Sequence, residues 1–240
     1  MRYFVVIPAA GSGRRFAAAL PKQYATLGTS TVIELSLAPF ENDPDCAGIV
    51  VALAPDDAHW PAVGARRPRL IEIAEGGEHR AHSVRNALRA LSSRVRDDDW
   101  VMVHDAARPC FTAADLATLK RELASHEAGG LLAIPVADTL KRAVHADFPF
   151  AEVEATVDRA GLWRAATPQV FRFGILSRAL EAALTDHRLP TDEAQAVEWA
   201  GHRPRLIAGR ADNIKVTTAE DLDLAGAILS LRTTSAGRQC

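Results

Sequence analysis

A strand-like run and a glycine-rich loop lie near the amino terminus: YFVVIPAAGSGRRFAAALPKQY, Tyr3–Tyr24. The apolar run Tyr3–Ile7 of this stretch is typical of a buried strand. Gly11 and Gly13 would allow backbone N–H groups to approach phosphate oxygens closely. Fixed positive charge follows on three side chains of the same stretch: Arg14, Arg15 and Lys22. The stretch therefore predicts a strand followed by a polyphosphate-binding loop, with a solvated basic turn as the alternative.

Two common phosphate-binding loops do not match this stretch. The dinucleotide pattern GxGxxG requires a third glycine where this chain has Phe16. The ribose-binding acid expected about 20 residues later would be Glu34, which falls inside a helical pattern. A Walker loop requires Gly-Lys followed by Ser or Thr, and the loop does not contain it. A nicotinamide or flavin site is therefore disfavoured, and a Walker site is excluded.

Predicted strands and helices alternate along most of the chain. Apolar runs predict strands at Tyr3–Ile7, Gly48–Ala54, Leu70–Ile73, Trp100–Val103, Gly130–Val136, Arg205–Ala208 and Ile214–Val216. Apolar spacings of three and four predict helices around Val32–Ala38, Val84–Leu91, Leu116–Leu123, Phe173–Leu184 and Thr191–Trp199, and a last helix from Thr218. This order indicates an α/β fold with a mostly parallel sheet flanked by helices.

The segment Asp138–Asp158 breaks this alternation. Glu152–Asp158 alternates polar and apolar residues after a turn-like Ala146–Pro149, which predicts an antiparallel hairpin with one wet face. Because a lone hairpin is marginal in water, we expect its apolar face to pack on a second subunit; folding back on its own domain is the alternative. We expect one domain over residues 1–232, with a β-arm at 138–160 and a flexible tail at 233–240.

Composition limits the partners of this chain. A formal net charge of -2 over 240 residues gives no overall attraction to nucleic acid or to an anionic membrane. No segment approaches the length of a signal peptide or a membrane span. Cys46, Cys110 and Cys240 lie far apart without zinc-site spacing, which predicts reduced thiols in a cytoplasmic protein.

The glycine loop is the first of several motifs that occur in order between residues 8 and 222. They are PAAGSGRRF with PKQY, GGEHRAHSV, VHDAARP, PVADTLKR, TVDRAGLW, TPQVF, TDEAQAVE and NIKVTTAEDL. Together they closely resemble the 2-C-methyl-D-erythritol 4-phosphate cytidylyltransferases of the non-mevalonate isoprenoid pathway. The resemblance implies a Rossmann-like nucleotidyltransferase fold with a projecting β-arm that forms a homodimer. It also implies CTP and a polyol phosphate as substrates, Mg²⁺ as cofactor, and a cytidylyl transfer that releases pyrophosphate.

The resemblance also implies roles for individual residues. The charge-stabilising catalytic residues would be Arg15, Lys22 and Lys215. The nucleotide would contact Ala9, Ala10, Gly11, Gly13, Gly77, Glu78, Arg80, Ser83, Asp105 and Ala106. The polyol phosphate would contact Asp105, Thr139, Arg159 and Thr167, and Asp105 would bind the metal.

Several alternatives stay open on the sequence alone. Asp105 and Arg108 could form an ion pair that only fixes their turn. Thr191, Asp192 and Glu193 could cap a helix with acids that suit its dipole. His104 has no metal-ligand companion and is expected to be a packed residue at a strand end. For the whole protein, the alternatives are a ribitol 5-phosphate cytidylyltransferase and a nucleotide-sensing homologue that performs no chemistry.

Overall fold

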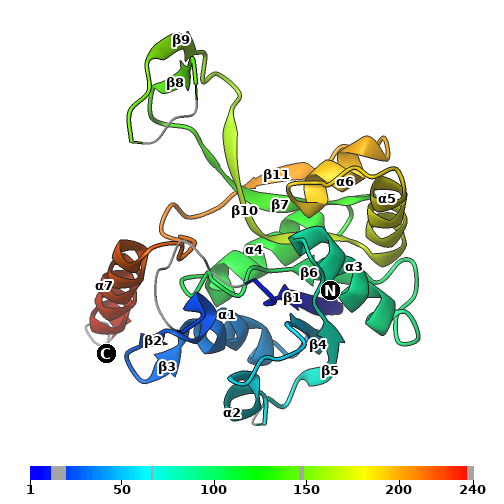
Figure 1. The fold of residues 1–240 in the computed structure, drawn as a ribbon. Helices are drawn as coiled ribbons and strands as arrows, with labels where there is room; N and C mark the ends of the chain where they lie inside the picture. The colour runs from blue at the N-terminus through cyan, green and yellow to red at the C-terminus, as the bar shows by residue number, and fades with distance from the viewer. Residues whose placement is uncertain (12–19, 66, 146–148, 237–240) are drawn as a thin grey trace.

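The computed structural model describes residues 1–11, 20–65, 67–145 and 149–236. A seven-stranded sheet forms the centre of the body, and a two-stranded arm projects from it (Figure 1). The strands of the sheet, in spatial order, are β11 Arg205–Ala208, β7 Gly129–Pro135, β10 Trp163–Arg172, β6 Trp100–Val103, β1 Tyr3–Pro8, β4 Cys46–Leu53 and β5 Leu70–Glu75. Pairing is parallel except for β10, which is antiparallel to both β6 and β7. The predicted mostly parallel sheet is confirmed.

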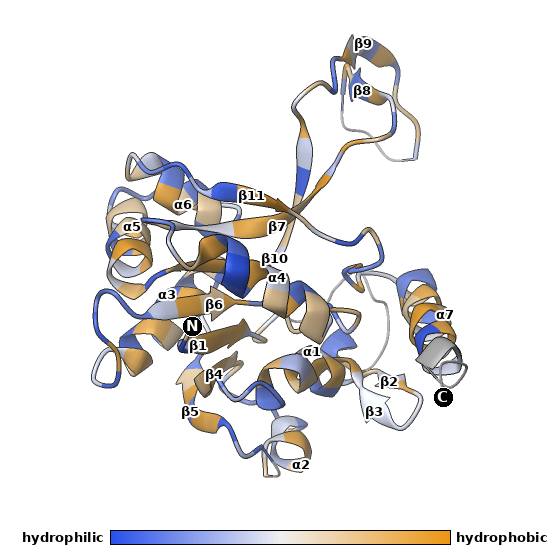
Figure 2. Ribbon diagram, turned by 180° about the vertical axis from the view of Figure 1, so that it is seen from behind, coloured by the Kyte–Doolittle hydropathy of each residue, from blue (hydrophilic) through white to orange (hydrophobic). Residues whose placement is uncertain are grey.

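Strand β1 shows why both faces of this sheet are covered. Its side chains alternate between two buried clusters, so that Tyr3, Val5 and Ile7 contribute to one and Phe4 and Val6 to the other. The first cluster contains α1 Val32–Glu41, α2 Trp60–Gly64 and α4 Ala113–Leu123, and the second contains α3 Arg80–Leu91, α5 Phe173–Thr185 and α6 Glu193–Trp199. Hydrophobic colour accordingly concentrates on β1, β4 and β6 (Figure 2).

The arm confirms the predicted hairpin. Strands β8 Leu140–Ala143 and β9 Val153–Val157 pair antiparallel at its tip, away from the body (Figure 1). Residues 146–148 of the expected turn lie outside the described residues. Among the described residues of the arm, three large apolar side chains are exposed: Val144 at 51%, Phe150 at 84% and Val153 at 61%. The hairpin therefore does not fold back on its own domain.

The structure corrects four sequence expectations. Ile214–Val216 forms no strand, because among the described residues the backbone of this segment bonds elsewhere only from Val216 N to Ala107 O. Helix α6 begins at Glu193 rather than Thr191, since Asp192 is the N-cap and accepts from Gln195 N. Helix α7 spans Ala219–Ala236, so its last turn includes residues expected in the tail. Strand β10 was not predicted as a strand.

Short elements between β1 and α1 also went unpredicted. They are the 3-10 helix η2 Lys22–Tyr24 and the small strands β2 Thr26–Leu27 and β3 Ser30–Thr31. Helix α7 packs beside β2, and its Ala225 joins a buried cluster with Ala107, Cys110 and Val216. Within the described part of the chain, no helix has the length and apolar character needed to cross a membrane.

Candidate active site

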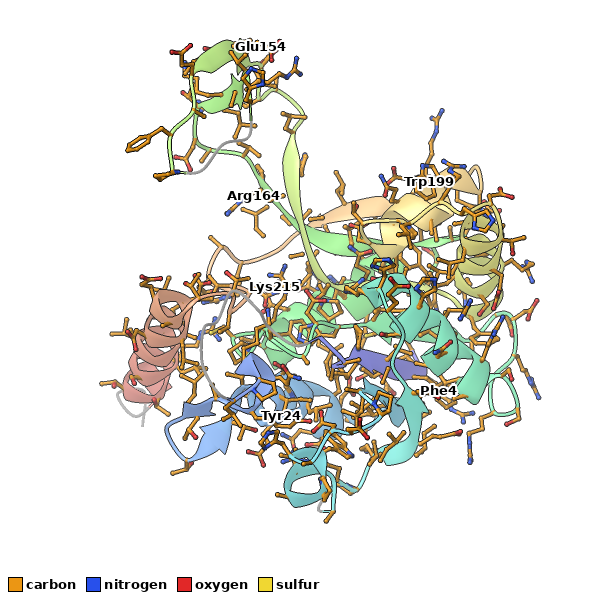
Figure 3. The ribbon with its side chains drawn as sticks, in the orientation of Figure 1. Phe4, Tyr24, Glu154, Arg164, Trp199 and Lys215 are labelled. Atoms are coloured by element: carbon orange, nitrogen blue, oxygen red, sulfur yellow. The ribbon has the colours of Figure 1, made fainter. Side chains whose placement is uncertain are left out.

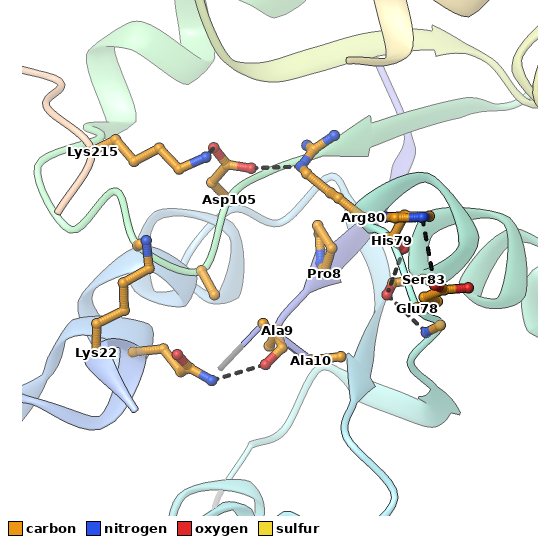
Figure 4. A pocket seen from close by; sticks show the side chains of 15 residues that line it. Pro8, Ala9, Ala10, Lys22, Glu78, His79, Arg80, Ser83, Asp105 and Lys215 are labelled. Carbon is orange, nitrogen blue, oxygen red and sulfur yellow. Dashed lines mark hydrogen bonds and ion pairs between the residues drawn. The ribbon is translucent and has the colours of Figure 1, made fainter. Parts of the chain in front are cut away.

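A cavity of about 590 Å³ opens at the carboxyl ends of β1, β5 and β6, where an open α/β sheet usually binds its ligand (Figure 4). It brings together these predicted site residues: Ala9, Ala10, Gly11, Lys22, Gly77, Glu78, Arg80, Ser83, Asp105, Ala106 and Lys215. Gly13, Arg14 and Arg15 lie outside the described residues. Thr139, Arg159 and Thr167 do not line this cavity.

Asp105 lies at the centre of the charged groups in the cavity. Its Oδ1 accepts from Arg80 Nε at 3.0 Å, and its Oδ2 lies 2.8 Å from Lys215 Nζ and 3.6 Å from Arg108 Nε. Burial alone would raise the pKa of Asp105, but these three cations outweigh it and hold the pKa far below its ordinary range. Asp105 is therefore a permanent anion that positions cations from α3, from its own turn and from the segment before α7.

Arg80 is held on its other side by Glu193. Arg80 Nη1 donates to Glu193 Oε1 at 2.6 Å, and Nη2 donates to Oε2 at 3.1 Å. Burial disfavours the charge on Arg80, yet the two carboxylates hold its pKa above the ordinary range. The Asp105–Arg108 ion pair considered from the sequence is present, but the Arg80–Glu193 pair joins helices far apart in the chain and could not be inferred from spacing.

Behind Asp105 lies a buried polar pair, His104 and Thr167. Thr167 Oγ1 accepts from Asp105 N at 3.0 Å and lies 3.1 Å from His104 Nδ1. His104 is fully buried against Phe40 and Phe111, as expected for a packed residue at a strand end. Burial lowers the pKa of His104 to about 3, so the ring is neutral at pH 7. The pair fixes the backbone of Asp105, and a direct role of Thr167 in substrate binding stays a prediction.

Lys22 is held at the cavity because the two residues that follow it in the chain are anchored. Gln23 Nε2 donates to Ala9 O at 2.9 Å within the protein interior. Tyr24 OH donates to Asp57 Oδ2 at 2.7 Å, in the loop that follows β4. These bonds connect η2 to the segments that follow β1 and β4. They give Gln23 and Tyr24 of the PKQY motif a structural role that the sequence alone did not indicate.

The loop after β5 closes the cavity on the side opposite Lys22 (Figure 4). Gly76 N donates to Leu53 O at 2.6 Å, and a Cβ at Gly76 would overlap Ala10 Cβ. Gly77 N donates to Ser83 Oγ at 3.0 Å. Gly76 is therefore required by close packing against the loop after β1, and Gly77 by close packing against His82 of α3. Ser83 supports the backbone that lines the cavity.

The arm residues lie apart from this cavity. Thr139 directly precedes β8 and Arg159 follows β9, whereas Lys215 lies in the body and Glu154 marks the arm (Figure 3). Arg159 Nη1 contacts Ala137 O and is exposed. The structure thus separates the predicted polyol phosphate residues Thr139 and Arg159 from the cavity of their own chain.

Comparisons with known proteins agree with this geometry. The sequence model of 2-C-methyl-D-erythritol 4-phosphate cytidylyltransferase matches residues 3–231. The enzyme of that name from Pseudomonas entomophila strain L48 is 52% identical over 222 residues, covering 92% of this chain and 93% of that protein. The crystal structure of a 4-diphosphocytidyl-2C-methyl-D-erythritol synthase superposes with a TM-score of 0.82 and 39% identity, covering 95% of this chain and 100% of that one.

A second solved structure extends this agreement. The 2-C-methyl-D-erythritol 4-phosphate cytidylyltransferase of Francisella tularensis superposes with a TM-score of 0.79 at 32% identity, covering 95% of this chain and 100% of that chain. These similarities span the sheet, the cavity and the arm rather than one motif. The chain therefore belongs to the 2-C-methyl-D-erythritol 4-phosphate cytidylyltransferase family.

Proposed function

We propose that this chain transfers the cytidylyl group of CTP to the phosphate of 2-C-methyl-D-erythritol 4-phosphate and releases pyrophosphate. The observation that carries the proposal is the cavity in which Lys22, Arg80 and Lys215 converge from three separate parts of the chain around the buried Asp105. Convergent cations at the carboxyl ends of parallel strands suit a triphosphate. The names of the relatives supply the identity of the acceptor.

The proposed reaction is an in-line displacement. A phosphate oxygen of the polyol phosphate forms a bond to the α-phosphorus of CTP, while the bond from that phosphorus to the oxygen bridging the β-phosphate breaks. The electron pair leaves on pyrophosphate. A phosphate monoester has its second pKa at about 6 and is largely dianionic at pH 7. The nucleophile therefore needs no protein base, and the chain must position the two anions and stabilise their charge.

We assign that stabilisation to Lys22 and Lys215, together with Arg15, which lies outside the described residues. Lys22 enters from η2 and Lys215 from the segment before α7, so the two ammonium groups reach the cavity from different elements. Gly77 and Glu78 line the cavity from the loop after β5, and Ser83 lines it from α3. We assign recognition of the cytosine and ribose to this loop, where backbone groups and carboxylate oxygens are available for hydrogen bonds.

Mg²⁺ is the proposed cofactor, and the donor groups fit it. Proteins usually bind Mg²⁺ through one or two carboxylates, with substrate phosphates and water as the other ligands. Asp105 is a buried, ionised carboxylate that lines the cavity. The described residues contain no cluster of three His, Cys, Asp or Glu side chains that could hold a metal ion. We propose that Asp105, whose oxygens also contact Arg80, Arg108 and Lys215, would hold the ion directly or through water, and that the ion would neutralise phosphate charge.

We propose a homodimer in which the arm of one chain completes the cavity of its partner. Thr139 and Arg159 flank the arm strands and do not line the cavity of their own chain. The exposed Phe150 and Val153 give the arm an apolar surface that a partner could cover. Arg159 would then bind the phosphate of the polyol across the interface.

The buried free thiols of Cys46 and Cys110 support the expectation of a cytoplasmic protein.

The test is pyrophosphate release from CTP and Mg²⁺ by purified protein. We expect release with 2-C-methyl-D-erythritol 4-phosphate, much less with ribitol 5-phosphate, and none without an acceptor. A higher catalytic efficiency with ribitol 5-phosphate would show that the proposed acceptor is wrong. CTP binding without pyrophosphate release would favour the nucleotide-sensing alternative. Arg159→Ala should raise KM for the polyol phosphate and leave CTP affinity unchanged. Sedimentation analysis tests the dimer.

A further inference from the structure

Glu193 is a buried carboxylate whose place in the fold is unusual. It is the first residue of α6, far from the cavity in sequence, and only 1% of its surface is exposed. Both of its oxygens accept from Arg80, the bidentate arrangement typical of an ionised carboxylate and a guanidinium. Burial raises the pKa of Glu193, and the contact with Arg80 opposes that rise. An ionised carboxylate is costly to bury, and here the bidentate contact with Arg80 offsets that cost.

The backbone beneath Glu193 is fixed from two sides. Gln169, on β10, donates through Nε2 to Asp192 Oδ2 at 2.9 Å and accepts through Oε1 from Ala194 N at 2.8 Å. Asp192 Oδ1 also accepts from Gln195 N at 2.9 Å as the helix N-cap. Asp192 and Gln169 thus hold the first turn of α6 against the sheet, which leaves the side chain of Glu193 directed at Arg80.

Arg80 connects this anchored carboxylate to the cavity. Three of the five N–H donors of a guanidinium are used here, two by Glu193 and one, on Nε, by Asp105. A planar guanidinium held by three such bonds has one orientation. Because Arg80 also lines the cavity, Glu193 sets where the positive charge of Arg80 stands relative to Asp105 and to an incoming ligand.

We infer that Glu193 is a positioning residue for the nucleotide site, acting through Arg80 to hold Asp105 and the adjoining wall of the cavity in the arrangement that binds CTP. This inference rests on the proposed function and deepens it. A glutamine at this position would place an amide NH₂ group, which is a donor, against one of the N–H donors of Arg80. The guanidinium would turn away, and Asp105 would lose one of the three cations that surround it.

The experiment compares Glu193→Gln, Arg80→Gln and the double variant with the wild type, by CTP titration calorimetry and by kcat and KM. Glu198→Gln, on an exposed position of the same helix, is the matched control and should behave as the wild type. We expect Glu193→Gln to weaken CTP binding and lower kcat/KM about 10- to 100-fold, the range found when the partner of a site residue is removed. Circular dichroism melting reports whether each variant folds.

The double variant identifies the route of the effect. If Glu193 acts through Arg80, the double variant should match Arg80→Gln within about twofold in CTP affinity and in kcat/KM. This comparison also serves if Glu193→Gln alone fails to fold, because the double variant leaves no buried charge unpaired. Wild-type CTP affinity in Glu193→Gln, or losses that multiply in the double variant, would overturn the inference. Since the titration needs no acceptor, its outcome is independent of whether the wild type releases pyrophosphate.

Discussion

His104 should make the folded protein sensitive to mild acid. The ring is fully buried beside Phe40 and Phe111, and burial lowers its pKa from 6.5 to about 3. The unfolded chain therefore binds a proton that the folded chain rejects, so stability is retained above the unfolded pKa and lost as pH falls below about 6.5. Between pH 7 and pH 5 these two pKa values correspond to a loss of about 2 kcal/mol from this one group.

The assay is urea unfolding at pH 7 and pH 5 of the wild type and of His104→Asn. The amide of asparagine can donate or accept near the position of Nδ1 and can keep the bond to Thr167, but it does not titrate. The variant should lose about 2 kcal/mol less between the two pH values than the wild type. His145→Asn, at an exposed position of the arm, is the control and should lose as much as the wild type. Equal losses in the wild type and in His104→Asn would show that His104 is not the group responsible.

Three further predictions follow from the walls of the cavity. Lys215→Met should fold normally and lower kcat about 10²- to 10³-fold in the pyrophosphate assay, since one aimed cation is lost; a loss below tenfold would contradict this. Gln23→Leu leaves the buried carbonyl of Ala9 without its partner and should cost about 1–3 kcal/mol in urea unfolding. Gly76→Ala should cost a similar amount by overpacking, whereas Gly11→Ala, whose new Cβ has no atom of the described residues within 4 Å, should not.

The sequence predicted those strands and helices whose hydrophobic pattern can be recognised within the segment itself. Strand β6 was predicted with its observed ends, and the alternation in β9 correctly indicated the arm. Strand β10 was missed because its polar residues and its proline hide the apolar pattern. Ile214–Val216 was wrong for the opposite reason, since a short β-branched run needs a neighbouring strand that the fold does not provide.

The sequence motifs predicted which residues form the candidate site, but not the contacts that hold those residues in place. The motifs identified Lys22, Asp105 and Lys215 as site residues, and the fold brings them to one cavity. No spacing rule indicates that Glu193 meets Arg80 across 113 positions of sequence, or that His104 supports Asp105 through a threonine on β10. Such contacts depend on how α6 and β10 pack on the sheet, which one sequence does not specify locally.

Local charge reconciles a chain of net charge -2 with a site for two anionic substrates. The buried network around Asp105 contains the cations Arg80, Arg108 and Lys215 and the carboxylates Asp105 and Glu193, which leaves one positive charge in excess. Lys22 adds another from η2. Because the carboxylates hold these cations in place before any ligand arrives, little reorganisation is needed when phosphate charge enters. The carboxylates therefore contribute to anion binding by fixing the geometry of the cations, even though their own charge opposes it.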